Sequence, residues 1–401
     1  MPTNTPGESP VLRVAIAGLG AAGCMMIPAL LKHPNVQIAG AADLDGEPLE
    51  KFTSDFHVEG HSTVESLCQS PDVDAIYIAT PTQLHTQHAL TAFENGKHVV
   101  LEKPMALTLE DAPAMIDSAE RNGVRLVVGH SHSYETPIRR ICEIVPSGEL
   151  GALRMIHNWY FTDWIYRLRN PEELDTKLGG GITFRQGSHQ FDIIRMIGGG
   201  LVRSVRAMTG VWDENRPTEG GHTVFLEFED GAAATAVYSG YDRFHTSEIT
   251  FGVGEHGQPA DTSVYGRARK RPRSGQNNES ESDLKRSSVR YGGDGARQRP
   301  PASNPPFYGF TIVSCQRGDI RQSENGLIIY GEDEKTEITL PTDETGRDAV
   351  VAELYEAAVN GRQPIHSGRW GMANLEVCLA VLESAKERKE IYLSNQVATL
   401  A

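Results

Sequence analysis

Short apolar runs alternate with helix-like periodicity over the first 130 residues of this 401-residue chain. Compact apolar runs, each followed by a segment with apolar residues three or four positions apart, indicate strands that alternate with helices. We expect strands at residues 11–17, 36–42, 74–79, 97–101 and 124–129. We expect helices at residues 21–32, 84–95 and 109–121. This order predicts βαβ units and a doubly wound parallel sheet with all strand carboxyl ends on one edge.

The pattern changes after residue 130, where single apolar positions alternate with polar ones. Such alternation predicts an antiparallel sheet with one covered face. We expect its strands at residues 153–161, 202–211, 222–229, 232–238, 311–314, 326–330 and 337–340. We expect helices at residues 137–145, 348–360 and 372–388. The predicted fold class is α/β, with a disordered tail at 1–10, a doubly wound domain at 11–132, and an α/β domain with a mainly antiparallel open sheet at 133–401.

Residues 255–305 interrupt the second domain with a stretch rich in Gly, Ser, Pro, Arg and Asn. A long segment with few apolar positions predicts a flexible loop rather than a packed element. It is either a tolerated insertion or a lid or intersubunit arm, and the sequence does not choose between these.

Composition excludes several classes of protein. A net charge of −15 argues against general nucleic-acid binding, which favours a basic surface. The five cysteines are scattered, so neither a disulfide framework nor a zinc site is expected, and reduced thiols fit a cytoplasmic protein. No apolar stretch approaches the ~20 residues that a membrane helix needs. No cluster of His, Cys and Asp has the spacing of metal ligands, so no metal is expected.

A glycine-rich turn follows the first predicted strand and opens the first predicted helix. This context makes the G-x-G-x-x-G pattern indicative of a dinucleotide site, because the backbone can approach a pyrophosphate at the helix N-terminus. Asp43 ends the second strand, where it can accept hydrogen bonds from adenosine ribose hydroxyls and would repel a 2′-phosphate. NAD is therefore favoured over NADP. The turn consists of Gly18, Leu19, Gly20, Ala21, Ala22 and Gly23.

Two further segments fall at the same predicted sheet edge. Thr80 and Pro81 follow the third strand with His85 just beyond, and Glu102-Lys103-Pro104 follows the fourth. Residues at this edge of a doubly wound sheet can reach a bound nucleotide and its substrate. For His85 a packing role is as good an interpretation as a cofactor contact. Lys103 is the candidate catalytic group, and a cis bond before Pro104 would hold its turn rigidly.

Four motifs, GLGAAG, ATPTQLH, HVVLEKP and GGGITFRQGSHQFD, together resemble the Gfo/Idh/MocA oxidoreductase family in their order and spacing. The resemblance implies an N-terminal Rossmann domain that binds NAD and an open C-terminal sheet that often mediates homo-oligomers, here a dimer or tetramer. It also implies that Lys103 contacts the substrate hydroxyl and that the catalytic histidine is His189. Lys103 could take the hydroxyl proton as hydride leaves the carbon, and His189 could share that proton or polarise the oxygen.

The chain departs from the family pattern at Arg185, where polyol dehydrogenases usually have an aspartate. A guanidinium suits a carboxylate, and Arg167 and Arg169 lie upstream on a predicted loop. The three arginines could converge on an anionic substrate, or Arg167 and Arg169 could pair with Glu172, Glu173 or Asp175. A pairing of Arg185 with Asp192 is also open.

Residues 164–200 are similar to the subgroup that contains phthalate 4,5-cis-dihydrodiol dehydrogenases. This resemblance implies a small anionic diol as substrate, with Trp164, Tyr166, Tyr134 and Phe184 as candidate walls around a flat ring, each of which could equally be core. The alternatives are a sugar or inositol-type dehydrogenase, an NAD-dependent glycosidase and a non-catalytic dinucleotide sensor.

Overall fold

The computed structural model describes residues 9–271, 279–293 and 302–400. The described residues form two compact units, and the first contains 9–129, 285–293 and 347–371 while the second contains the rest. The first boundary lies close to the predicted one at 132, but two later segments return to the first unit. Most of the predicted tail at 1–10, and residues 272–278 and 294–301 of the predicted insertion, lie outside the described residues.

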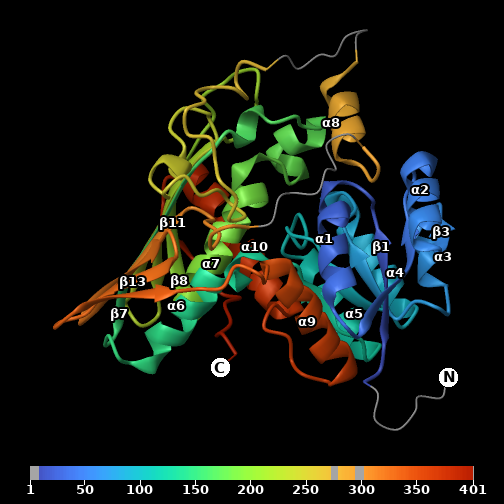
Figure 1. The fold of residues 1–401 in the computed structure, drawn as a ribbon, viewed down its shortest axis with the longest axis horizontal. Coiled ribbons are helices and arrows are strands. Elements are labelled where there is room, and N and C mark those ends of the chain that lie inside the picture. The colour runs from blue at the N-terminus through green and yellow to red at the C-terminus, as the bar shows by residue number, and fades with distance from the viewer. Residues whose placement is uncertain (1–8, 272–278, 294–301, 401) are drawn as a thin grey trace. The chain divides into compact units, whose positions relative to one another are not determined.

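The first unit is built on a six-stranded parallel sheet with the strand order β3-β2-β1-β4-β5-β6 (Figure 1). This is the Rossmann order, in which the strand order reverses between β1 and β4 and leaves a crevice at the strand carboxyl ends. The strands are β1 (Leu12–Ala17), β2 (Val36–Ala42), β3 (Glu59–His61), β4 (Ala75–Ile78), β5 (His98–Leu101) and β6 (Leu126–Val128). The central strands are almost wholly buried, as expected of parallel strands covered on both faces.

Helices connect these strands as the alternating sequence pattern predicts. They are α1 (Ala21–Lys32), α2 (Gly46–Phe56), α3 (Val64–Cys68), η1 (Thr82–Leu84), α4 (His85–Glu94) and α5 (Asp111–Arg121), with α9 (Gly346–Val359) from the end of the chain. The sequence did not predict α2, β3 or α3, because β3 has only three residues and α2 is largely polar. Three helices, α8 (Glu281–Val289), α9 and α10 (Gly368–Glu387), have residues in both units.

The second unit contains a nine-stranded sheet with the order β14-β13-β12-β11-β7-β10-β9-β8-β15. All its neighbouring strands are antiparallel except β7 and β10, so the predicted mainly antiparallel sheet is confirmed. The strands are β7 (Leu153–Phe161), β8 (Val202–Gly210), β9 (Gly221–Phe228), β10 (Ala233–Ser239), β11 (Phe310–Cys315), β12 (Gly318–Ser323), β13 (Gly326–Tyr330), β14 (Lys335–Thr339) and β15 (Ile391–Tyr392).

One face of this sheet is covered by α7 (Ser188–Ile197), which packs on β7 and β10, and α6 (Thr136–Ser147) packs beside α7 (Figure 1). Along β7 the even-numbered residues Ile156, Asn158 and Tyr160 are buried, whereas their odd-numbered neighbours are more exposed. Because strand side chains alternate between faces, the buried set lies on the face next to α7. Short helical turns complete the unit: η2 (His132–Tyr134), η3 (Trp164–Tyr166), η4 (Pro171–Leu174), η5 (Thr176–Leu178), η7 (Thr246–Glu248) and the π-helical turn η6 (Thr183–Gly187).

Within the described ranges, none of the helices is both long and apolar enough to cross a membrane. Those same ranges contain no group of three His, Cys, Asp or Glu side chains arranged to hold a metal ion.

Candidate active site

The glycine-rich turn between β1 and α1 has the backbone that a dinucleotide pyrophosphate needs. Gly18 adopts a left-handed φ of +98°, which favours glycine. A Cβ at Gly23 would collide with the carbonyl oxygen of Gly18, so only glycine lets the helix begin this close to the strand. Around Gly20, by contrast, no atom of the described residues beyond its immediate neighbours in the chain and its own helix lies within 4 Å of where a Cβ would stand. Open space therefore lies beside the first N–H groups of α1, which can bind phosphate oxygens.

Asp43 stands directly after β2, next to this turn. Its Oδ2 accepts a hydrogen bond of 2.7 Å from the backbone N–H of Leu19, and its Oδ1 accepts one of 2.8 Å from Asp45. These two bonds fix a half-buried carboxylate beside the glycine turn. The arrangement fits the adenosine ribose of NAD, whose hydroxyls can donate to such a carboxylate.

His85, at the start of α4, joins two loops at the carboxyl edge of the sheet. Its side chain is buried, with Nδ1 3.0 Å from the carbonyl oxygen of Pro104 and Nε2 2.9 Å from that of Thr80. A neutral imidazole donates one such bond and the imidazolium donates both. His85 therefore braces the turn that carries Lys103 against the Thr80-Pro81 loop, and its predicted contact with the cofactor stays a prediction.

Lys103 follows β5 in the turn predicted from the sequence, and the Lys103–Pro104 bond is cis. The carboxylate of Glu102 accepts a hydrogen bond from the hydroxyl of Tyr77 and a second, of 3.2 Å, from the backbone N–H of Lys103. Burial and the charge of Glu102 raise the pKa of Tyr77 well above its ordinary value, so Tyr77 remains a donor. Glu102 is thus anchored to the sheet, and Lys103 lies half-buried beside the end of β4 and β5.

His189, the other predicted catalytic residue, lies in the second unit at the start of α7. The π-helical turn η6 leads into this helix, and such turns are rare and frequent at functional sites. The imidazole is 6 % exposed. It packs edge-on against the rings of His132 and Tyr308, with ring centroids 4.5 and 5.1 Å away.

A cluster of polar aromatic side chains surrounds His189 on the covered face of the nine-stranded sheet. The hydroxyl of Tyr308 donates to the backbone oxygen of Gln186 at 2.8 Å, within the π-helical turn. The hydroxyl of Tyr160, from β7, donates to Oε2 of Glu255 at 3.1 Å, and Nε2 of His132 is 3.5 Å from Oε1 of the same carboxylate. A ring contact between His189 and His132 and a close approach of His132 to Glu255 therefore connect these three residues.

The acidic groups of this cluster differ in their ionisation. Burial acts to raise the pKa of Glu255, but His256, His132 and Arg167 together hold it well below its ordinary value. Burial first, and then Glu255, raise the pKa of Tyr160 well above its ordinary value. Glu255 is consequently an anion and Tyr160 a neutral donor at any working pH.

Four residues of this cluster were not among those predicted from the sequence: His132, Tyr160, Glu255 and Tyr308. Two of them had a usable signal, because Tyr160 lies on the inward side of the β7 alternation and His132 follows the end of the last parallel strand. Glu255 has none, since it opens the polar insertion.

Arg167 lines a cavity of about 150 Å³ together with Tyr160, His245 and Glu255. Its Nε donates to Asp163 at 2.7 Å, and its side chain is 43 % exposed. A guanidinium that gives Nε to one carboxylate still carries four other N–H donors. This cavity is the place in the second unit where Arg167 could meet an anionic group.

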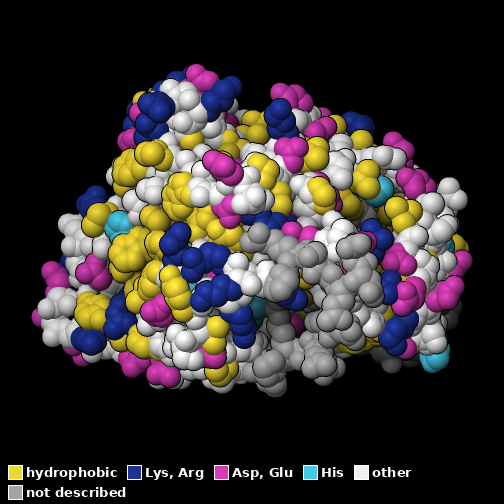
Figure 2. Space-filling model, turned by 90° about the horizontal axis from the view of Figure 1, so that it is seen from above, with side chains coloured by type: hydrophobic (Ala, Val, Ile, Leu, Met, Phe, Trp, Pro, Cys, Tyr) yellow, Lys and Arg dark blue, Asp and Glu magenta, His cyan; other side chains and the backbone are white. Residues whose placement is uncertain are grey.

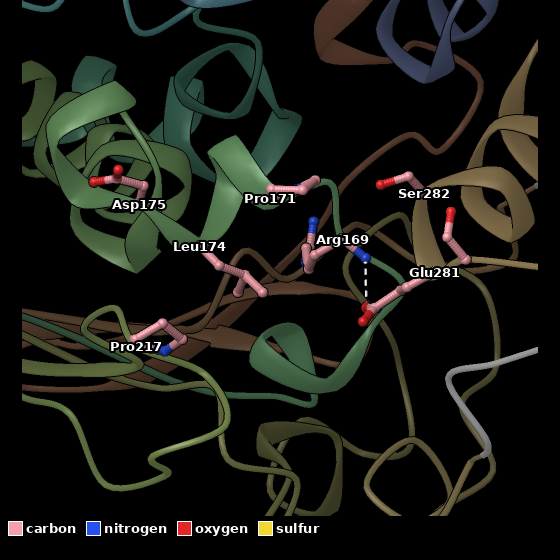
Figure 3. A pocket seen from close by; sticks show the side chains of 8 residues that line it. Arg169, Pro171, Leu174, Asp175, Pro217, Glu281 and Ser282 are labelled. Carbon is pink, nitrogen blue, oxygen red and sulfur yellow. Dashed lines mark hydrogen bonds between the residues drawn. The ribbon is translucent and has the colours of Figure 1, made fainter.

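Arg169 has a different environment from Arg167. Its guanidinium stacks 3.8 Å above the ring of Trp164, donates to that residue's carbonyl oxygen and pairs with Glu173 at 3.3 Å. Its backbone N–H donates to Glu281, as Figure 3 shows in a larger cavity of about 620 Å³. Burial lowers the pKa of Arg169 to about 10. The pairing of Arg169 with Glu173, one of the two alternatives, is therefore present.

The remaining predicted substrate residues belong to the second unit. Arg185 lies half-buried in the π-helical turn, and its Nε donates to the carbonyl oxygen of Gly179 at 2.9 Å. Tyr166 is buried in η3, with its ring 6.4 Å from that of Tyr241. The other two candidate walls, Tyr134 and Phe184, are also buried.

Comparison with known proteins matches both units to one family. Residues 12–130 match the model described as an oxidoreductase family with an NAD-binding Rossmann fold, and residues 138–258 match the GFO/IDH/MocA C-terminal domain. A 1-carboxy-3-chloro-3,4-dihydroxycyclohexa-1,5-diene dehydrogenase from Comamonas testosteroni is 39 % identical over 94 % of this chain and 95 % of its own.

Solved structures give the same fold. A crystal structure from Bordetella bronchiseptica RB50 has a TM-score of 0.90 and 38 % identity, covering 96 % of this chain and 100 % of its own. The WlbA dehydrogenase from Bordetella pertussis, in complex with NADH and UDP-GlcNAcA, has a TM-score of 0.68 at 19 % identity over 96 % of this chain and 99 % of its own. The second similarity supports the fold alone.

Proposed function

This chain belongs to the Gfo/Idh/MocA family of NAD-binding oxidoreductases, and we propose that it oxidises a carboxylated cis-dihydrodiol to an aromatic diol. The observation that carries the proposal is the likeness, across both units, to a dehydrogenase named for a carboxylated dihydroxycyclohexadiene. Within this class we propose phthalate 4,5-cis-dihydrodiol as the substrate and 4,5-dihydroxyphthalate as the product, in the degradation of aromatic compounds.

NAD, when bound, accepts the hydride that leaves one ring carbinol carbon with the electron pair of its C–H bond. We assign to Lys103 the acceptance of the hydroxyl proton, and to His189 the polarisation of the carbinol oxygen. The ketone formed beside the second carbinol then tautomerises to the aromatic diol. Aromatisation makes the overall oxidation strongly favourable.

The proton released at the carbinol needs a path to solvent, and the His132–Glu255 pair supports one. His132 is in ring contact with His189 and 3.5 Å from the Glu255 carboxylate, which lines the cavity with Arg167. An ionised Glu255 stabilises a proton on His132. In this proposal His189 shares the proton that Lys103 takes from the hydroxyl, and releases it along these residues after each turnover.

For the substrate carboxylates we propose Arg185 and Arg167. Arg185 replaces the aspartate expected four residues before His189, so its guanidinium belongs to the same π-helical turn and helix as the proposed catalytic group. Arg167 opens onto the cavity beside Tyr160. Arg169 is a weaker candidate, because Trp164 and Glu173 already hold its guanidinium.

We also propose that the chain forms a homo-oligomer through the uncovered face of the nine-stranded sheet. Met155 and Trp159 on β7 and Phe225 on β9 are 46, 39 and 46 % exposed on strands whose opposite faces are buried. Apolar side chains gathered on one sheet face mark an interaction surface.

The proposed activity is tested by incubating the enzyme with NAD and phthalate 4,5-cis-dihydrodiol. The expected result is stoichiometric formation of NADH and of 4,5-dihydroxyphthalate, identified by mass spectrometry. Inositol, glucose and aryl glycosides serve as comparison substrates. Faster turnover of a neutral polyol, or glycoside hydrolysis without net NADH, would overturn the proposal.

A further inference from the structure

A segment far along the sequence packs on the adenosine side of the cofactor turn. Residues 285–293 belong to the first unit, although the insertion that contains them interrupts the second. The backbone N–H of Tyr291 donates to the carbonyl oxygen of Leu19, in the glycine-rich turn, at 2.9 Å. Its hydroxyl donates to Asp55 at 2.9 Å, and its ring meets that of Phe52 edge-on at 5.1 Å.

Arg290 makes a second attachment on the same side. Its guanidinium pairs with Oδ2 of Asp45 at 3.1 Å and with Oε2 of Glu47 at 2.7 Å, and its side chain is 24 % exposed. The N–H of Asp45 in turn donates to Asp43, the carboxylate that fits the ribose hydroxyls. The Leu19–Asp43 hydrogen bond borders the ribose subsite. Tyr291 bonds directly to Leu19, and Arg290 contacts Asp43 indirectly, through Asp45.

We propose that Arg290 and Tyr291 form one wall of the adenosine subsite for NAD. The bond from Tyr291 to Leu19 holds the peptide whose N–H binds Asp43. The inference rests on the NAD-binding fold of the first unit and is independent of the proposed substrate.

The positive charge of Arg290 offsets the negative charge around the adenosine subsite. Asp43, Asp45 and Glu47 place three carboxylates within five consecutive residues at the end of β2, and the pyrophosphate of NAD adds further negative charge. Like charges repel more strongly as their separation and the local dielectric constant decrease. By pairing with Asp45 and Glu47, Arg290 offsets this repulsion and leaves Asp43 to accept the ribose hydroxyls.

The test measures the dissociation constants of NAD and of ADP-ribose by isothermal titration calorimetry, without turnover. ADP-ribose retains the adenosine and pyrophosphate but lacks nicotinamide. For Arg290→Gln we expect both ligands to bind about fivefold more weakly, by the same factor, as partly exposed ion pairs allow. Arg286→Gln is the matched control, because Arg286 lies exposed on α8 in the same segment, and we expect it to leave both constants unchanged.

A second measurement monitors hydrogen exchange in the segment that carries Arg290 and Tyr291. We expect NAD to slow hydrogen exchange at residues 285–293, because the cofactor would bury the wall, and we expect Arg290→Gln to reduce this protection. The proposal is overturned if Arg290→Gln binds both ligands like Arg286→Gln, or if it weakens NAD alone. Tighter binding by Arg290→Gln would also overturn it, since the segment would then compete with the cofactor.

Discussion

Glu255 illustrates how a single carboxylate organises its neighbours in the second unit. It accepts the Tyr160 hydrogen bond, stands 3.5 Å from His132 and 3.7 Å from His256, and lines the cavity that contains Arg167. These neighbours lower the pKa of Glu255 against the effect of burial. Because the pKa is lower in the folded state than in the unfolded chain, Glu255 stabilises the fold above the unfolded value of about 4.3, and this stabilisation is lost as the pH falls below it.

Glu255→Gln should therefore destabilise the protein most at neutral pH. We expect a loss of about 2 kcal/mol at pH 7, the scale of a hydrogen-bonded charge, and a difference from wild type that narrows as the pH falls below about 4.3. Thermal unfolding of wild type and Glu255→Gln across this pH range measures the difference in stability. A difference that is constant with pH would mean that Glu255 is not held as an anion by its neighbours.

Arg185→Ala tests the carboxylate contact at a single residue. Loss of a buried ionic contact of several kcal/mol should lower kcat/KM for a carboxylated dihydrodiol by about 100-fold or more. Arg185→Lys keeps the charge but not the planar guanidinium, so its kcat/KM should lie between those of wild type and Arg185→Ala. Turnover by Arg185→Ala at the wild-type rate would exclude Arg185 from substrate binding.

At the residue scale, motif and strand position were enough to place the glycine turn, Asp43 and Lys103 on one sheet edge. The motif resemblance also singled out His189, but the helix α7 in which it lies was not predicted. The partners of His189 could not be predicted in the same way, because Tyr308 and Glu255 come from loops whose sequence has no periodicity. Tertiary packing alone brings them together.

At the level of elements, α7 is tied to the sheet by a buried polar network. Gln190 donates to Asn158 on β7 at 2.6 Å and faces Nε2 of His222 on β9 at 2.9 Å. Asn158 in turn donates to the carbonyl oxygen of Tyr308. Since Gln190 directly follows His189, this network fixes the helix start that carries the proposed catalytic imidazole.

His222→Gln tests this network through the pH dependence of stability. Burial lowers the pKa of His222 to about 3, so between about pH 6.5 and 3 the unfolded chain binds a proton that the folded state does not. As the pH is lowered through this window, the free energy of unfolding should therefore decrease by up to about 1.4 kcal/mol per pH unit because of this residue. We expect a flatter profile in His222→Gln, whose amide can keep a donor to Gln190.

The control for this measurement is His57→Asn. His57 is exposed, and asparagine tolerates its left-handed φ of 55°. The explanation fails if His222→Gln and wild type lose stability in parallel between pH 6.5 and 4.

The elements differ in how well the sequence predicted them. Strands with a strong period of two, such as β7, β9 and β10, were predicted to within two residues. The helix α2 and the strand β3 were missed, because a polar helix and a three-residue strand leave little hydrophobic signal. The helix α8 lies in the insertion expected to be a loop, and none of its residues is fully buried.

At the scale of the whole molecule, the chain carries a net charge of −15 but has both basic and acidic side chains on its surface. On the face shown in Figure 2, basic and acidic side chains are interspersed, with hydrophobic side chains gathered between them. The mixed charges on this face provide no broad basic field for nucleic acid. The feature that calls for a partner is instead the apolar sheet face of Met155, Trp159 and Phe225.

Charges placed on this face should dissociate the proposed oligomer. We expect the double variant Trp159→Glu and Phe225→Glu to elute as a monomer while wild type elutes as a dimer or tetramer, because a buried unpaired carboxylate is costly. Light scattering coupled to size-exclusion chromatography measures the mass. Leu31→Glu is the control, since Leu31 is equally apolar and 61 % exposed on α1. A monomeric wild type, or an unchanged mass in the double variant, would reject this interface.

The central claim is that the enzyme selects a carboxylated cis-dihydrodiol. It is tested most directly by the ratio of kcat/KM for phthalate 4,5-cis-dihydrodiol to that for the matching cis-dihydrodiol without carboxylates, followed as NADH formation by wild type. The account predicts a ratio of about 100 or more, because guanidinium contacts of several kcal/mol are lost with the carboxylates. A ratio near one would contradict it.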